Sequence, residues 1–88
     1  MNREKFYLDM TEYLETLDEE AGELEIAPDD NLFDEGIVTS YSVVKMIAHL
    51  EKLVGRPIDV SQYGVERFYT LSGLYDVVID AEAQYAGA

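Results

Sequence analysis

The fold is decided by the stretch Leu32-Phe33-Asp34-Glu35-Gly36-Ile37-Val38-Thr39-Ser40-Tyr41, which leads directly into a run of helical periodicity. Gly36 favours a turn. Thr39 and Ser40 are residue types that begin helices, because their side-chain oxygens accept hydrogen bonds from the free N–H groups of the first turn. The stretch therefore predicts an apolar loop that ends at the start of a helix.

The helix after this stretch is predicted over about Ser40–Val54. Glycine and proline in Gly55-Arg56-Pro57 end it. Val44 and Ala48 lie beside its apolar stripe and are expected to be partly exposed. The residues of the stripe itself, which recur at steps of three and four and should face the core, are Val43, Met46, Ile47, Leu50, Leu53 and Val54.

Upstream, the same periodicity predicts a first helix over about Glu4–Leu17, closed by Glu19-Glu20-Ala21-Gly22. Its apolar face consists of Phe6, Met10, Tyr13, Leu14 and Leu17. The connection from Glu23 to Thr39 carries turn residues but also large apolar ones. We expect it to be ordered and packed on the core, with a single helical turn at Leu32-Phe33.

Downstream, Ile58-Asp59-Val60 is expected to be extended, followed by one short helix within Ser61–Tyr69 that packs through Val65, Phe68 and Tyr69. Thr70 should cap a last helix over about Leu71–Ala83, and residues 84–88 should fray. The predicted fold is all-α. It is a small four-helix bundle of three main helices and one short one, forming a single domain over residues 1–88 with a long ordered loop between helices one and two.

Composition narrows the possible functions. The chain has 88 residues, of which 48% are hydrophobic, so it suits one small core rather than a disordered tail. Six basic residues against 19 acidic ones give a net charge of −13, which disfavours nucleic acid and anionic lipid as partners. There is no cysteine, so disulfides and thiolate chemistry are excluded. No secretory signal or membrane span is apparent, and we expect a cytoplasmic monomer.

Ser40 is the candidate functional residue. A serine that caps a helix lies outside the helix proper, where its hydroxyl reaches solvent beside free N–H groups that favour a phosphodiester. No base is in view to activate it, which suits a hydroxyl modified by a separate enzyme better than a nucleophile. On local sequence alone, Thr39 or Ser40 could simply cap the helix. Ser42, the nearest other hydroxyl, is expected one turn inside it.

Together, these residues resemble the acyl and peptidyl carrier protein family. The resemblance rests on Leu32-Phe33-Asp34-Glu35-Gly36 and Ile37-Val38-Thr39-Ser40-Tyr41, and continues through Val43–Ile47, Leu50-Glu51 and, more weakly, Pro57-Ile58 and Phe68–Leu71. It implies a non-enzymatic carrier whose 4′-phosphopantetheine, derived from coenzyme A, is attached to Ser40 and holds an acyl group as a thioester. The implied partners are a phosphopantetheinyl transferase, an adenylating or other loading enzyme, and enzymes that accept or modify the acyl group.

The chain departs from the family at two positions: Thr39 stands where aspartate is most frequent, and Tyr41 where leucine is often found. Three residues separate Gly36 from Ser40, as in D-alanyl carriers and some stand-alone aminoacyl and aryl carriers. By resemblance, the partner-recognition positions are Ile37, Val38, Thr39, Tyr41, Val44, Lys45 and Ala48. Lys45, His49 and Lys52 make this face less acidic than in fatty-acid carriers, which hints at dedicated partners.

The leading hypothesis is thus a stand-alone acyl, aminoacyl or aryl carrier of a natural-product pathway such as nonribosomal peptide synthesis. The runner-up is a D-alanyl carrier for cell-wall polymers, which Asp59-Val60-Ser61-Gln62-Tyr63-Gly64-Val65-Glu66 resembles. A non-enzymatic acidic adaptor is the alternative from another class. A Ser40 hydrolase lacks a convincing base, and the acidic pairs lack the spacing of a calcium loop, so no metal site is predicted.

Overall fold

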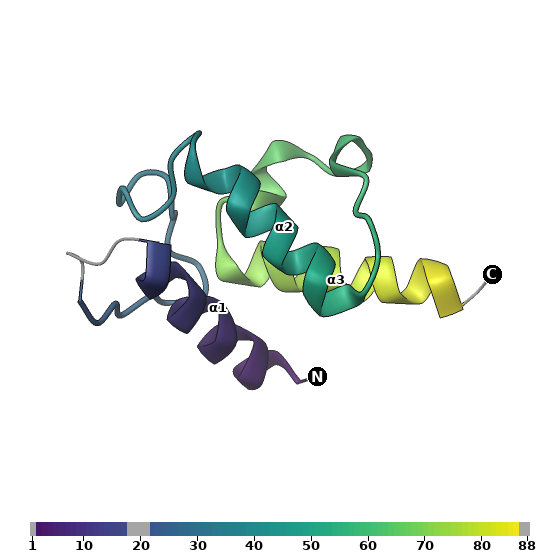
Figure 1. The fold of residues 1–88 in the computed structure, drawn as a ribbon, viewed down its shortest axis with the longest axis horizontal. Coiled ribbons are helices and arrows are strands. Elements are labelled where there is room, and N and C mark those ends of the chain that lie inside the picture. Colours follow the sequence, from purple (N-terminus) through teal and green to yellow (C-terminus); the bar gives the residue numbers. More distant parts are fainter. Residues whose placement is uncertain (1, 18–21, 87–88) are drawn as a thin grey trace.

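The regular structure of the described residues consists of three α-helices and two short 3-10 helices. They are α1 (Arg3–Leu17), α2 (Ser42–Val54), η1 (Val60–Gln62), η2 (Val65–Phe68) and α3 (Leu71–Ala86), with no strand among the described residues. The computed structural model describes residues 2–17 and 22–86 (Figure 1). The all-helical prediction is confirmed.

Helix α3 is the central element, because α1, α2 and η2 all pack against it. In Figure 1, α2 passes in front of α3, and the long connection between α1 and α2 lies at the end of the molecule opposite the C-terminus. The buried apolar side chains come from every helix except η1 and from the connecting loops. They are Phe6, Met10, Leu14, Leu32, Val38, Met46, Leu50, Ile58, Phe68, Leu71, Leu74, Val77 and Val78.

The predicted apolar faces of α1 and α2 are the faces that meet the core. Phe6, Met10 and Leu14 are buried from α1, and Met46 and Leu50 from α2. The remaining stripe residues of α2, namely Val43, Ile47, Leu53 and Val54, are half-buried against that core. Of the segment predicted to close α1, Glu19-Glu20-Ala21 lies outside the described residues.

The ends of the helices follow the capping chemistry of the sequence. Asn2 Oδ1 accepts from the Lys5 N–H at 2.7 Å and begins α1. Gly55 ends α2 in the left-handed conformation (φ 79°), as its position before Pro57 predicts. Thr70 Oγ1 accepts from the Gly73 N–H at 3.0 Å, so Thr70 caps α3 as predicted. That helix continues past the predicted end at Ala83 to Ala86.

The segment between α2 and α3 differs from the single short helix that we expected over Ser61–Tyr69. It forms η1 and η2, because the backbone is extended at Tyr63 (φ −120°, ψ 149°) and at Gly64 (φ −68°, ψ 146°). Phe68 is buried, whereas Val65 is 62% exposed and does not make its predicted core contact. Asp59 begins η1 by accepting from the Ser61 hydroxyl and N–H, bonds that lower the pKa of its carboxyl group.

Helices α1 and α2 are joined by a polar contact on the surface. The imidazole Nε2 of His49 lies 2.9 Å from Asp9 Oδ2, and the ring stacks on Tyr13 with centroids 3.9 Å apart. The Tyr13 hydroxyl in turn donates to the Lys45 carbonyl oxygen at 3.0 Å. His49 is therefore a packed structural residue that links two helices.

Gly73 allows η2 to approach α3 closely. A Cβ atom at this position would lie 2.3 Å from the Arg67 carbonyl oxygen. We expect Gly73→Ala to lower the free energy of unfolding by about 1–3 kcal/mol through overpacking, although alanine is the better helix former. Urea denaturation would measure this.

The matched control is Ala83→Gly, the reverse exchange at an exposed position of α3. It should cost about 1 kcal/mol through helix propensity alone. If Gly73→Ala stabilised the protein, as propensity alone would dictate, the close approach of η2 to α3 would be disproved.

Candidate functional site

The site begins with Leu32, which organises the loop in front of α2. Its side chain is buried in the core. Its N–H donates to the Tyr69 carbonyl oxygen at 2.7 Å, and its own carbonyl oxygen accepts from the N–H groups of Ile37 (2.9 Å) and Val38 (3.0 Å). The main chain therefore returns to Leu32 after five residues and is fixed beside η2.

Two residues shape the turn that Leu32 closes. Asn31 Oδ1 accepts from the N–H groups of Phe33 and Asp34, both at 3.0 Å. Gly36 has φ +72°, a left-handed conformation that a residue with a Cβ atom adopts only under strain. The predicted helical turn at Leu32-Phe33 is thus a hydrogen-bonded turn over residues 32–36. The Phe33 ring packs edge-on against Tyr69, with centroids 5.3 Å apart.

Thr39 and Ser42 form a reciprocal cap at the start of α2. The Thr39 N–H donates to Ser42 Oγ at 2.8 Å, and the Ser42 N–H donates to Thr39 Oγ1 at 3.3 Å. The Thr39 carbonyl oxygen accepts the first helical bond, from the Val43 N–H at 2.9 Å. This is the pattern of a capping box, with serine in the place of the usual glutamate or glutamine.

Ser40 is therefore not the capping residue, contrary to our expectation from the sequence. It lies in the turn between Thr39 and α2, and Tyr41 after it already has a helical backbone (φ −76°, ψ −46°). The correction has a physical reason: the Thr-x-x-Ser spacing allows two side chains to satisfy each other, and Ser42 completes that pair. Sequence reasoning missed this role of Ser42, although the spacing carried the signal.

The Ser40 hydroxyl is exposed and forms no hydrogen bond with any described residue. The backbone N–H groups of Ser40 and Tyr41 are likewise unengaged within the described part of the chain. These donors lie at the positive end of the α2 dipole. The hydroxyl and the N–H groups together suit an anionic phosphodiester built on Ser40.

The predicted partner-recognition residues divide into exposed and buried ones. Tyr41 (75% exposed) and Val44 (67% exposed) form an apolar surface next to Ser40. Thr39, Lys45 and Ala48 are exposed as well, and Ile37 is half-buried. Val38 is only 1% exposed, because its side chain packs into the core while its N–H bonds Leu32, and we correct its assignment to the recognition surface.

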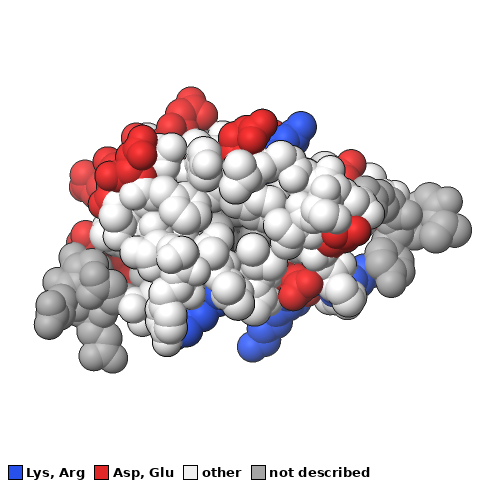
Figure 2. All heavy atoms as spheres, turned by 90° about the horizontal axis from the view of Figure 1, so that it is seen from above, with Lys and Arg blue, Asp and Glu red and all other residues white. Residues whose placement is uncertain are grey.

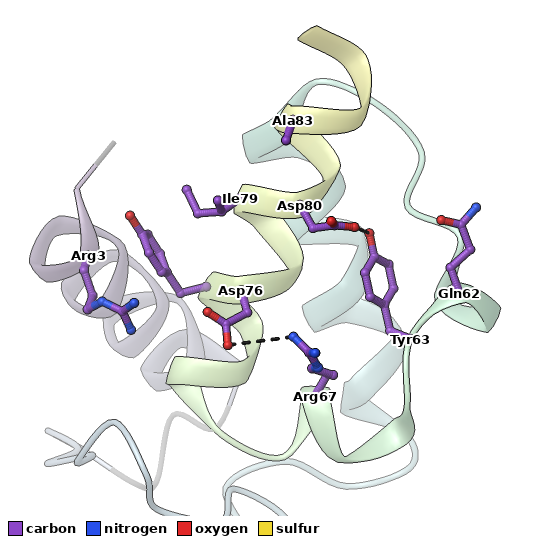
Figure 3. Close-up of a pocket in the computed structure, with 9 residues that line it drawn as sticks. Arg3, Gln62, Tyr63, Arg67, Asp76, Ile79, Asp80 and Ala83 are labelled. Carbon is purple, nitrogen blue, oxygen red and sulfur yellow. Dashed lines mark hydrogen bonds and ion pairs between the residues drawn. The ribbon is translucent and has the colours of Figure 1, made fainter. Parts of the chain in front are cut away.

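A cavity of about 580 Å³ lies elsewhere, along α3 and against the start of α1. Figure 3 shows Arg67 paired with Asp76 and Tyr63 bonded to Asp80, at 3.8 and 2.8 Å. Burial and the bond to Asp80 raise the pKa of the Tyr63 hydroxyl. No residue of α2 or of the Ser40 turn lines this cavity, and its charged groups of both signs are balanced.

The described residues contain no cluster of three or more His, Asp or Glu side chains that could hold a metal ion. Within the same residues, no helix has the length and apolar character needed to cross a membrane.

A comparison with protein families shows to which family the chain belongs. The family model for the phosphopantetheine attachment site matches residues 11–78, which is most of the chain. The chain belongs to this family. Neither the curated proteins nor the solved structures contain a significant match.

Membership gives the general function of the protein. Domains of the phosphopantetheine attachment family bear 4′-phosphopantetheine covalently and act as non-catalytic carriers. They receive the group from phosphopantetheinyl transferases and interact with further enzymes. The protein is thus a phosphopantetheine-bearing carrier, as its sequence predicts.

The reciprocal cap has a measurable consequence for stability. We expect Thr39→Ala and Ser42→Ala each to lower the free energy of unfolding by about 1 kcal/mol, because each removes capping bonds of α2. The double variant should lose less than the sum, since the two side chains share those bonds. Chemical denaturation would measure all three.

Ser40→Ala is the control, since its hydroxyl makes no bond within the described structure. It should change the free energy of unfolding by no more than about 0.5 kcal/mol. A loss as large as that of Thr39→Ala would show that Ser40, and not the Thr39–Ser42 pair, caps the helix.

Proposed function

We propose that Ser40 carries the 4′-phosphopantetheine of this carrier, and that the protein presents acyl or aminoacyl thioesters to the enzymes of a natural-product pathway. The observation that supports Ser40 is the state of its hydroxyl. It is exposed at the start of a helix whose cap is made by other residues, beside unengaged N–H groups. The other hydroxyls of this turn, those of Thr39 and Ser42, are engaged with each other.

The chemistry of attachment fits this position. The Ser40 oxygen would form a bond to the phosphorus of the pantetheine phosphate, and the pyrophosphate bond of coenzyme A would break, releasing adenosine 3′,5′-bisphosphate. No described side chain bonds the Ser40 oxygen to activate it, so the transferase must supply the base. Once attached, the flexible arm raises the effective concentration of its thioester at each partner's active site.

The specialised setting is supported by residues around Ser40. Thr39 keeps a capping oxygen without adding a carboxylate, and the face of α2 next to it carries Lys45, His49 and Lys52. Such a surface differs from an acidic one that general fatty-acid enzymes would bind. A D-alanyl carrier is the second candidate, favoured by the segment from Asp59 to Glu66, which contains η1 and the start of η2.

The test is an intact-mass measurement. The protein, incubated with coenzyme A and a broad-specificity phosphopantetheinyl transferase, should gain the mass of one phosphopantetheine. Ser40→Ala should gain nothing. Ser61→Ala, at an exposed serine of η1, should be modified like the wild type, and peptide mapping should locate the group on Ser40 rather than Thr39 or Ser42.

A gain that persists in Ser40→Ala would move the site to another hydroxyl. No gain with several transferases would favour the remaining alternative, an acidic adaptor without modification. Incubating the modified protein with candidate adenylating enzymes would separate the two carrier settings, since a D-alanyl carrier accepts D-alanine and an aryl or aminoacyl carrier accepts its own acid.

A further inference from the structure

A basic groove lies on α2 at its contact with α1. It has a volume of about 260 Å³ and is lined by Tyr13, Lys45, Ala48, His49 and Lys52. Three of these, Lys45, His49 and Lys52, follow one another along one face of the helix at steps of four and three. We call these five residues the basic groove.

Among the described residues, neither lysine of the groove has an acidic partner. On α2, the residues three and four positions from Lys45 and Lys52 include no aspartate or glutamate. Neither ammonium group forms an ion pair within the described residues. In a chain with 19 acidic residues against six basic ones, two unpaired lysines on one face are informative, because carboxylates are plentiful everywhere else.

The described acidic side chains near the groove either bond to groups other than the two lysines or lie on α1. The Glu51 carboxylate accepts from the Ile58 N–H at 2.7 Å, beyond the end of α2. On α1, the Asp9 carboxylate lies 2.9 Å from the His49 imidazole and forms no ion pair with either lysine. Glu12 lines a separate hollow on α1 together with Lys5 and Leu8. Within the described residues, the Lys45 and Lys52 ammonium groups of the basic groove therefore have no carboxylate partner.

The basic groove lies on the helix that begins beside Ser40. With a rise of about 1.5 Å per residue, Lys45 and Lys52 lie about 7.5 and 18 Å from Ser40 along the helix axis. Tyr41 bridges the interval, since the Lys45 ammonium lies 4.9 Å from the centroid of its ring. An enzyme that reaches Ser40 along α2 would therefore cover the basic groove together with the exposed side chains of Tyr41 and Val44.

Acidic side chains gather at one end of the face that Figure 2 shows. On the same face, lysine and arginine side chains lie mostly along the lower edge, where acidic side chains lie beside them, and one lies at the upper edge next to an acidic side chain. At physiological salt, screening limits the interaction between exposed charges to distances of about 8 Å. The basic groove can therefore select partners at short range even though the net charge of the protein is −13.

We propose that the basic groove docks an acidic segment of the enzymes that act at Ser40, with their carboxylates paired to Lys45 and Lys52. This inference rests on the proposed role of Ser40. A protein segment suits the basic groove better than a nucleic acid, whose continuous phosphate charge is repelled by the rest of this acidic surface. The partner would thus carry carboxylates where an acidic carrier helix would demand lysines and arginines.

The test compares the rate of modification by the phosphopantetheinyl transferase among charge variants of the full chain. The double variant Lys45→Glu/Lys52→Glu should lose about tenfold in kcat/KM at low salt, and added salt should narrow the difference. Lys45→Gln/Lys52→Gln should fall between it and the wild type. Lys5→Glu, an exposed lysine of α1 outside the groove, is the control and should be modified at the wild-type rate.

An unchanged rate in the double glutamate variant would overturn the proposal, and a faster one would show that the partner surface is basic. Both outcomes leave the mass gain at Ser40 intact, so they are distinct from failure of the proposed function. If no transferase modifies the wild type, a glutamate-rich helical peptide titrated into the ¹⁵N-labelled chain decides the matter. The changes in amide chemical shift that the peptide causes should centre on residues 45–52 and vanish in the double glutamate variant. They should also exceed the changes caused by an oligonucleotide of equal charge. Any other pattern would refute the docking.

Discussion

The backbone of Leu32 is the constraint on which the site depends. Its carbonyl oxygen holds the N–H groups of Ile37 and Val38, its N–H holds the Tyr69 carbonyl oxygen, and its side chain fills the core. A buried backbone group without a partner costs a substantial part of the stability of a small domain. The loop in front of α2 can thus satisfy its polar groups only in a conformation that delivers Thr39 and Ser40 to the start of the helix.

Helix α2 is held at both ends and at its side. Its beginning is capped by Thr39 and Ser42. Its end is fixed by the left-handed Gly55 and by the Glu51 side chain. Its middle is bonded to α1, through Tyr13 to the Lys45 carbonyl oxygen and through Asp9 to His49. Elements that are tied in this way open rarely. The start of α2 beside Ser40 is therefore tied to the rest of the fold, and the reach that a carrier needs would come from the attached arm.

Much of this arrangement could be predicted from the sequence. The helical periodicity placed α1, α2 and α3, Thr70 and Gly55 marked their ends, and the motif around Ser40 indicated the family. What failed depended on contacts that periodicity does not encode. Val38 looked available at the end of a loop, but the return of the chain to Leu32 buries it. Likewise, Ser42 became a capping residue because of its pairing with Thr39, and the extended backbone at Tyr63 and Gly64 divided the expected short helix.

The separation of Ser40 from the cap determines how the fold would respond when the arm is attached. Thr39 and Ser42 hold the helix, so the oxygen that would receive the arm contributes no bond to the fold. Attachment of the arm would then break no bond of the fold, and its effect on the folding equilibrium would come from the phosphate beside the N–H groups of Ser40 and Tyr41. The enzymes that act on the carrier would then have to distinguish its unmodified, modified and acylated forms by the arm and the acyl group attached to it.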